Sequence, residues 1–187
     1  MKIGIQGNEG STNETACRFF AKKHGWRDFE IKYLITSENV LKALNNGEID
    51  YGTFAWATSN GGHVAETKEA AKKYKFEKVD EHDFFPDHAL LSNSEIDAAK
   101  TIHVFSHPQA LAAHEDFLRS EFENVRLHEE IDTAVVAQYL SEGKYPKNSI
   151  VIAPADCAQI YGLKIFSSDL PANKGYKTTI FLVKKPL

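Results

Sequence analysis

Short segments rich in β-branched and aromatic residues alternate along this chain with segments of helical length, and this alternation constrains the fold most. Strands that alternate with helices of about ten to fifteen residues form parallel βαβ units. The pattern therefore predicts an α/β protein. We expect strands at residues 2–6, 29–35, 49–56, 75–84, 88–92, 101–105, 124–128, 149–153, 163–166 and 176–184.

Two breaks in the alternation predict a division into lobes. A polar stretch near residues 80–87 contains Pro86, which cannot continue a strand ladder, and the chain returns through residues 163–175. We expect a single domain, residues 1–187, made of two lobes with a ligand cleft between them. One lobe would hold residues 1–80 and 163–187, and the other residues 81–162.

Composition and charge exclude two classes of partner. The net charge of the 187-residue chain is −4 and its basic residues are dispersed, so nucleic acid is not expected as a partner. No apolar run approaches the roughly 18 residues that cross a membrane. Cys17 and Cys157 lie in apolar helical segments, typical of reduced core thiols. We expect a cytoplasmic protein, and a homodimer is one possible oligomeric state.

The segment Ser106-His107-Pro108-Gln109-Ala110-Leu111 joins a predicted strand to a predicted helix. Pro108 stands where the first helical residue is expected, and Ser106 is expected to accept a hydrogen bond from the first turn. Ligands of open α/β sheets bind beyond the carboxyl ends of strands, and helix N-termini favour anions. The segment is therefore one wall of an anion site or an ordinary capped turn, and these residues alone leave both open.

The turns, taken in chain order, resemble those of the prephenate dehydratase catalytic domain. Ser106 to Leu111 matches that family's most specific motif without a change. The other similar motifs are Gly7-Asn8-Glu9-Gly10-Ser11, Asp50-Tyr51-Gly52, Glu66-Thr67, Asp132-Thr133-Ala134, Tyr161-Gly162-Leu163 and Thr179-Ile180-Phe181, the last standing where the family has Thr-Arg-Phe. The resemblance covers essentially the whole chain.

This resemblance implies a two-lobed fold of the periplasmic-binding-protein type. It also implies a lyase that removes the ring hydroxyl and a carboxylate from prephenate to give phenylpyruvate, in phenylalanine biosynthesis, with no cofactor and no metal. The expected partner is thus a small-molecule carboxylate. Full-length relatives carry a C-terminal regulatory domain that binds phenylalanine, and we expect none after Leu187.

The resemblance also implies site residues. Thr179 would protonate the departing hydroxyl, and Ser106 and His88 would stand in the catalytic centre, with His88 either structural or a proton donor near neutral pH. The expected substrate-binding residues are Glu9, Ser11, Thr58, Ser59, Gln109, Ala110, Leu111, Thr133 and Phe181. The triplets Glu81-His82-Asp83 and His128-Glu129-Glu130 are expected to be solvated faces rather than metal ligands.

Several positions depart from the family pattern. Ile180 replaces the arginine that grips a substrate carboxylate, and Ala57 and Ala113 replace polar residues. Trp56 and His63 replace smaller residues of the long loop. Two alternatives to dehydration therefore stay open: a non-aromatising prephenate decarboxylase, and a non-catalytic protein that binds a metabolite.

Overall fold

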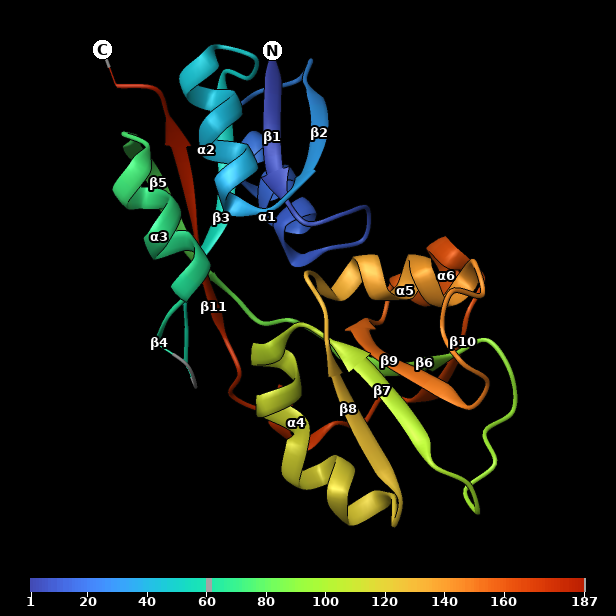
Figure 1. The fold of residues 1–187 in the computed structure, drawn as a ribbon. Helices are drawn as coiled ribbons and strands as arrows, with labels where there is room; N and C mark the ends of the chain where they lie inside the picture. Colours follow the sequence, from blue (N-terminus) through green and yellow to red (C-terminus); the bar gives the residue numbers. More distant parts are fainter. Residues whose placement is uncertain (60–61, 187) are drawn as a thin grey trace. The chain divides into compact units, whose positions relative to one another are not determined.

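The computed structural model describes residues 1–59 and 62–186 (Figure 1). The chain forms two compact units. The first lobe comprises Met1–Asn8, Thr12–Phe85 and Lys177–Leu187, and the second lobe comprises Glu9–Ser11 and Pro86–Tyr176. Each lobe contains a sheet of its own with helices on both faces.

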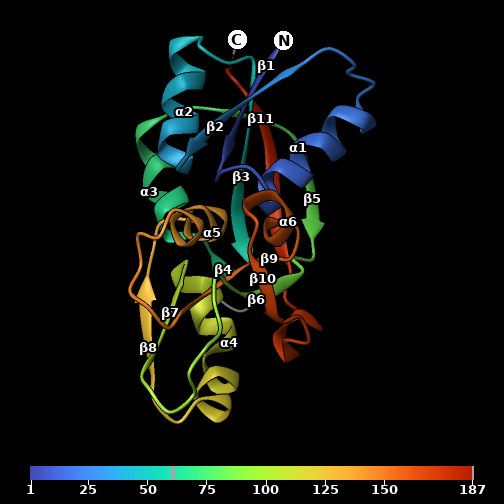
Figure 2. The same cartoon turned by 90° about the vertical axis from the view of Figure 1, so that its right-hand side faces the viewer.

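The first lobe is built on a mixed sheet with strand order β2-β1-β3-β11-β5, and β4 pairs with β3. Strands β1, β2 and β3 are parallel, whereas β11 runs antiparallel to both β3 and β5 (Figure 2). Its strands are β1 (Lys2–Gln6), β2 (Glu30–Ile35), β3 (Tyr51–Thr58), β4 (Gly62–His63), β5 (Glu77–Phe84) and β11 (Thr178–Lys184); its helices are α1 (Thr12–Lys23), α2 (Ser37–Asn46) and α3 (Ala65–Lys73).

Side-chain alternation divides the first lobe's core between the two faces of its sheet. Ile180 and Leu182 of β11 pack with Ala16 and Phe20 of α1, while their neighbours Phe181 and Val183 pack on the side of α2 and α3. Gly52 lets α2 approach closely, because a Cβ there would lie 2.6 Å from Cγ1 of Val40. That contact explains the glycine of the Asp50-Tyr51-Gly52 motif in terms of packing.

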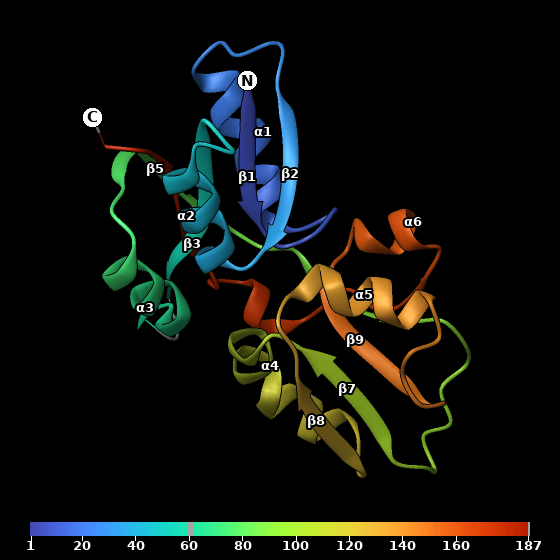
Figure 3. The same ribbon diagram turned by 45° about the horizontal axis from the view of Figure 1, so that its top comes forward.

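The second lobe is built on a five-stranded sheet of order β10-β6-β9-β7-β8. Strands β7, β8 and β9 are parallel (Figure 3). Strand β6 runs antiparallel to β9 and to β10. Its strands are β6 (His88–Ser92), β7 (Ile102–Ser106), β8 (Val125–Glu129), β9 (Ser149–Pro154) and β10 (Lys164–Ser167); its helices are α4 (Pro108–Glu121), α5 (Thr133–Ser141), α6 (Cys157–Tyr161) and the 3₁₀ turn η1 (Pro171–Asn173).

Helices α4 and α5 cover opposite faces of this second sheet. Val104 of β7 packs in a cluster with Leu111 and Leu118 of α4, and the next residue, Phe105, packs with Ala134 and Ala137 of α5. Successive side chains of a strand point to opposite faces, so the two helices must lie on different sides. This arrangement sets the N-termini of both helices beyond the carboxyl ends of β7 and β8.

The observed division into lobes differs from the expected one at residues 9–11, 81–85 and 163–176. β10 pairs with β6, and Leu163 and Leu170 are buried in the core clusters of the second lobe. The chain consequently rejoins the first lobe only at Lys177. The expectation of parallel pairing was also too general, because β5, β6, β10 and β11 all pair antiparallel.

The predicted character of the two cysteines is confirmed. Cys17 and Cys157 are both free and buried. Burial raises the pKa of the Cys17 thiol to about 12, which keeps it protonated and unreactive at neutral pH. Over the residues that the structure describes, no helix is long and apolar enough to span a bilayer.

Candidate functional site

The second lobe brings several of the expected site residues to one edge of its sheet. Ser106 ends β7, Thr133 begins α5 just after β8, and His88 begins β6 opposite Pro154 at the end of β9. Carboxyl ends of parallel strands are where α/β folds hold ligands. This carboxyl edge, with His88, Ser106, Gln109 and Thr133, is the candidate site of the second lobe.

Ser106 is not the helix cap that the sequence analysis expected. Its side chain is fully buried, and its Oγ donates to the carbonyl oxygen of Ile152 at 2.7 Å. The cap is His107, whose Nδ1 accepts from the N–H of Gln109 at 3.3 Å. The Ser106 hydroxyl therefore joins β7 to β9, and the expected role as a cap belongs to the neighbouring residue.

The first turn of α4 offers few free amides to an anion. Pro108 has no N–H, the Gln109 N–H is bonded to His107, and the Ala110 N–H donates to the His107 carbonyl at 2.9 Å. Ala110 and Leu111 are only 2% and 5% exposed, and their side chains pack in the core cluster under α4. Of the two interpretations left open for this segment, the capped turn is the better one.

Thr133 and Gln109 are the more accessible polar residues at this edge. Both are half-buried, and both lie in the first turn of a helix. The adjacent Asp132 caps α5 by accepting from the N–H groups of Ala134 and Val135, each at 2.9 Å. The hydroxyl of Thr133 and the amide of Gln109 are consequently the helix-terminal groups best suited to contact a ligand.

His88 is almost completely buried, at 3% exposure, and its Nδ1 lies 3.1 Å from Nε2 of His114 on α4. Burial, with a smaller contribution from the neighbouring His114, lowers the pKa of His88 to about 3. Burial likewise lowers the pKa of His114 to about 4. Both rings are therefore neutral at physiological pH, and His88 is not an acid that titrates near neutrality.

Two of the family-like motifs meet in the second lobe. The Tyr161 hydroxyl donates to the Glu9 carbonyl at 2.8 Å, and the Cys157 thiol contacts the Gly10 carbonyl at 3.7 Å. Gly10 has a φ of +83°, and a Cβ there would lie 2.8 Å from Ile160, so only glycine fits. The backbone from Glu9 to Ser11 is thus fixed against α6, with the Glu9 side chain exposed and Ser11 buried.

Thr179 belongs to the first lobe, where it forms part of a charged group. Its Oγ1 donates to Oδ1 of Asp83 at 2.6 Å, and Nζ of Lys177 lies 2.6 Å from the other carboxylate oxygen. The hydrogen bonds from Lys177 and then from Thr179 hold the pKa of Asp83 below its usual value. The hydroxyl proton of Thr179 is therefore bonded to an anion.

Ile180 occupies the position of the family's arginine but faces the core. It is 0% exposed and packs with Phe20 and Leu182. No carboxylate clamp can form from this position without burying a charge. The side chain that replaces the family's arginine is thus held by apolar packing and carries no charge.

Phe181, expected to contact substrate, is instead part of an aromatic cluster. It is 8% exposed and stacks on Trp56 with ring centroids 4.9 Å apart, and Trp56 in turn meets His63 edge-on at 5.4 Å. Trp56 of β3 therefore packs against both His63 of β4 and Phe181 of β11. Trp56 packs against the core of the first lobe, whereas His63 is exposed.

Thr58 and Ser59 lie at the end of β3, beside the start of β11. The N–H of Ser59 donates to the Lys177 carbonyl at 3.0 Å, and its Oγ accepts from the Lys177 N–H at 3.1 Å. Thr58 is 6% exposed. Both residues therefore align the strand that carries Thr179, and residues 60–61 of the same loop lie outside the described part of the chain.

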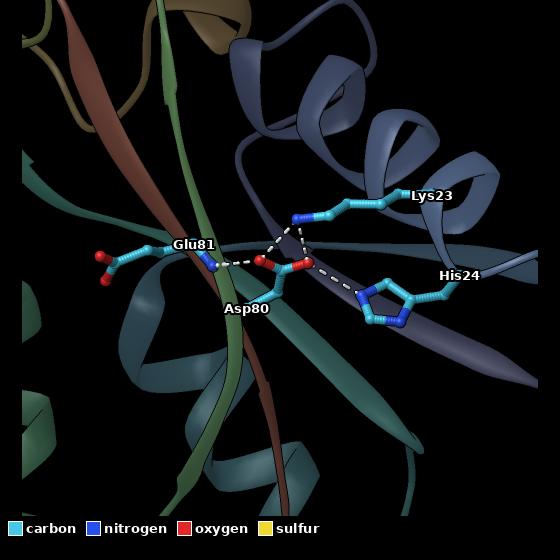
Figure 4. Close-up of polar contacts among 4 residues, drawn as sticks. All are labelled: Lys23, His24, Asp80 and Glu81. Carbon is cyan, nitrogen blue, oxygen red and sulfur yellow. Dashed lines mark hydrogen bonds and ion pairs between the residues drawn. The ribbon is translucent and has the colours of Figure 1, made fainter.

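The first lobe also contains a polar cluster that the sequence analysis did not find. Figure 4 shows Lys23 and His24 of the α1 end converging on the carboxylate of Asp80, at 2.7 and 3.0 Å. Burial raises the pKa of Asp80, but the bonds from Lys23, the Glu81 N–H and His24 outweigh it and leave the pKa lowered. The cluster joins the end of α1 to β5 and stabilises the packing of these two elements.

His114 is the second residue that the sequence analysis missed. It lies on the apolar stripe of α4 with Ala110, Leu111 and Leu118, at the spacing of one helix face. A histidine within such a stripe is the available sequence signal. Among residues 1–59 and 62–186, no three His, Cys, Asp or Glu side chains are grouped so that they could hold a metal ion.

Comparison with known proteins identifies the family. A sequence model described as prephenate dehydratase matches residues 3–186, nearly the whole chain. The chain belongs to the prephenate dehydratase family. It is 24% identical over 182 residues to a bifunctional chorismate mutase/prephenate dehydratase of Enterobacter agglomerans, an alignment that covers 97% of this chain and 46% of that protein. The chain thus spans about half the length of that curated relative.

Solved structures agree on the two-lobed fold of the periplasmic-binding-protein type. The prephenate dehydratase of Arthrobacter aurescens, solved with L-Phe, aligns with a TM-score of 0.81 at 19% identity, over 100% of this chain and 61% of that one. A periplasmic substrate-binding protein of an ABC transporter from Coxiella burnetii aligns with a TM-score of 0.57 at 15% identity, over 99% and 84%. At these identities the likeness concerns the fold alone.

Proposed function

We propose that this protein is a lyase that acts on prephenate or a closely related small cyclic carboxylate. The observation that carries the proposal is the grouping of family-motif residues at the carboxyl edge of the second sheet, where His88, Gln109 and Thr133 provide neutral polar groups. Family membership supports the substrate class. By the family resemblance, Thr179 of the first lobe is the residue that would protonate a departing hydroxyl.

Two reactions of prephenate fit this class. In dehydration the ring loses carbon dioxide and its hydroxyl group and becomes aromatic, which yields phenylpyruvate. In non-aromatising decarboxylation the bond to the carboxylate breaks, the ring takes up a proton, and the hydroxyl stays, which yields dihydro-hydroxyphenylpyruvate. Only dehydration requires a proton donor for a departing hydroxyl.

The geometry of the first lobe favours decarboxylation. If Thr179 gave up its proton, its alkoxide would stand 2.6 Å from the Asp83 carboxylate, and two adjacent negative charges repel strongly. Ile180 supplies no cation to the leaving carboxylate or hydroxyl. Dehydration with Thr179 as the acid is therefore the second candidate.

A test with purified protein separates these functions from simple binding. Nuclear magnetic resonance of a mixture with prephenate should show prephenate consumed and a decarboxylated keto acid formed. His88→Gln should lower the rate, while His103→Gln, at a partly exposed histidine of the same lobe, should not. If prephenate at a hundred times its Kd stabilises the protein by about 2.7 kcal/mol without being consumed, the protein binds a metabolite and is no lyase.

A further inference from the structure

The buried pair of histidines in the second lobe has a hydrogen-bonding pattern that can be worked out atom by atom. Nδ1 of His88 faces Nε2 of His114 at 3.1 Å, and the two residues are 3% and 1% exposed. The other nitrogen of His114, Nδ1, is buried and has no hydrogen-bond partner among residues 1–59 and 62–186. One nitrogen of each ring therefore takes part in the contact between the rings. The position of the proton on each ring is still to be determined.

Each neutral ring carries one proton, so only two arrangements give a hydrogen bond between the rings. In the first, His114 is protonated on Nε2 and donates to His88. In the second, His88 is protonated on Nδ1 and donates to His114, whose own proton must then sit on Nδ1. That second arrangement buries an N–H donor with no acceptor, and orphaned N–H groups are rarer in native structures than orphaned acceptors.

The first arrangement fixes the state of His88. Because its Nδ1 accepts from His114, its proton must be on Nε2. The backbone of His88 is also held, since its carbonyl accepts from the side-chain amide of Asn173 at 2.8 Å and its strand pairs with β9. Tyr176 lies against the ring, with centroids 5.6 Å apart. The ring is thus fixed from three sides.

We propose that His114 is a positioning residue that donates from Nε2 to His88 and thereby presents His88 to the substrate as a neutral Nε2–H donor. The role of His88 is then to hydrogen-bond a carboxylate or keto oxygen rather than to transfer a proton. This inference rests on the proposed function for the identity of the substrate. The orientation of the pair rests on the contacts alone.

The same lobe contains a second pair of histidines that serves as a control. Nδ1 of His103 lies 2.9 Å from Nε2 of His128, but both residues are partly exposed and His128 stacks on Phe105, on the face that α5 covers. Substitutions in this pair change a histidine–histidine bond on the face of the sheet opposite to α4, the helix that carries His114.

The first test measures the tautomer of His88 by ¹⁵N–¹H correlation spectra of the ring nitrogens, without any ligand. We expect the neutral Nε2–H form of His88 from pH 8 to pH 5. The Nδ1–H form in the wild-type protein would overturn the inference, as would a protonated ring at pH 6.5.

The second test uses prephenate as the probe and compares His114→Leu with His114→Gln. Loss of the oriented donor should weaken prephenate binding about tenfold in His114→Leu, seen as a raised KM with a smaller change in kcat. His114→Gln keeps an amide N–H close to the place of Nε2 and should keep most of the affinity. His128→Gln should bind like the wild type, and circular dichroism should show all three variants folded.

The outcomes distinguish this inference from the proposed function. Unchanged binding by His114→Leu, with an unchanged His88 tautomer, overturns the positioning role. If the wild type neither binds nor converts prephenate, the proposed function is overturned, and the ligand-free spectra still decide how the pair is oriented.

Discussion

The two lobes hold their functional side chains in opposite electrostatic states. In the first lobe Thr179 is bonded to the carboxylate of Asp83, which is paired with Lys177 and is accessible to solvent. In the second lobe His88 and His114 are neutral and almost fully buried. The hydroxyl of the first lobe is therefore held by a charged group, whereas the histidines of the second lobe are neutral and desolvated.

This difference teaches how a family motif can lose its charge without losing the fold. Ile180 stands where the family has an arginine and is part of the core. Lys177, just before β11, forms an ion pair with Asp83. Substrate anions would then be recognised by neutral donors in the other lobe. Each of the following predictions tests one side of this comparison.

The largest effect is expected when Ile180 is replaced by arginine. The substitution would bury an unpaired guanidinium against Phe20 and Leu182 and should lower the free energy of unfolding by about 3 kcal/mol or more. Urea unfolding measures it, with Ile180→Val as the control at about 1 kcal/mol. A stable arginine variant that forms phenylpyruvate faster would show that the site is still shaped for the clamp.

A fall in pH should destabilise the second lobe before the first. The pKa values of His88 and His114 lie below the ordinary value of 6.5, so between about 6.5 and 4 the unfolded chain binds protons that the folded chain does not. Their contribution is complete above pH 6.5 and is lost as the pH falls, on the order of 2 kcal/mol for each histidine by pH 5.

The first lobe depends on carboxylates and responds in another range. The lowered pKa values of Asp80 and Asp83 give stability that is present above the ordinary value of 3.8 and is lost below it. Hydrogen exchange read by peptide mass spectrometry at pH 7 and pH 5 reports on each lobe. Equal loss of protection in both lobes at pH 5 would contradict this assignment.

A smaller effect is expected at the cluster of Figure 4. Asp80→Asn removes the anion that Lys23 and His24 share and should cost about 1 kcal/mol of stability, the upper end for a partly exposed pair. Glu81→Gln is the matched control, because Glu81 joins the cluster through its backbone N–H alone. If both variants unfold at the same urea concentration, the cluster does not contribute to stability.

The smallest effect is expected for Thr179→Val. The variant keeps the volume but removes the hydroxyl, and Asp83 retains its bond to Lys177. Since decarboxylation needs no acid for a leaving hydroxyl, prephenate turnover should fall less than tenfold. A fall of about 10² or more, the effect of one positioned acid, would restore Thr179 to the role of proton donor.

Much of the fold could be predicted from the sequence, because local signals placed the elements. Thr36 caps α2 and Gly47 ends it in the left-handed conformation, and both residue types are typical of those positions. The pairing of β10 could not be found in this way. This four-residue edge strand belongs to the second lobe because it pairs with β6 and because Leu163 and Leu170 are buried there. Neither the pairing nor the burial can be predicted from the neighbouring residues in the sequence.

The candidate site was predictable in its motifs but not in the state of its side chains. The sequence located Ser106, His88 and Thr179. In the structure, however, the hydroxyl of Ser106 donates to the Ile152 carbonyl and that of Thr179 donates to the Asp83 carboxylate. His114 was hidden among apolar residues of α4. A hydrogen-bond partner 26 residues away in the chain depends on how helix and strand pack, which residue types alone do not specify.

The most direct test of the account is the ratio of phenylpyruvate formed to carbon dioxide released when the wild-type protein consumes prephenate. Both reactions release one carbon dioxide for each prephenate, but only dehydration forms the aromatic product. With Thr179 bonded to Asp83 and Ile180 in the core, the account predicts carbon dioxide release with a ratio far below one. A ratio of one would contradict it and would identify the protein as a dehydratase that works without the arginine.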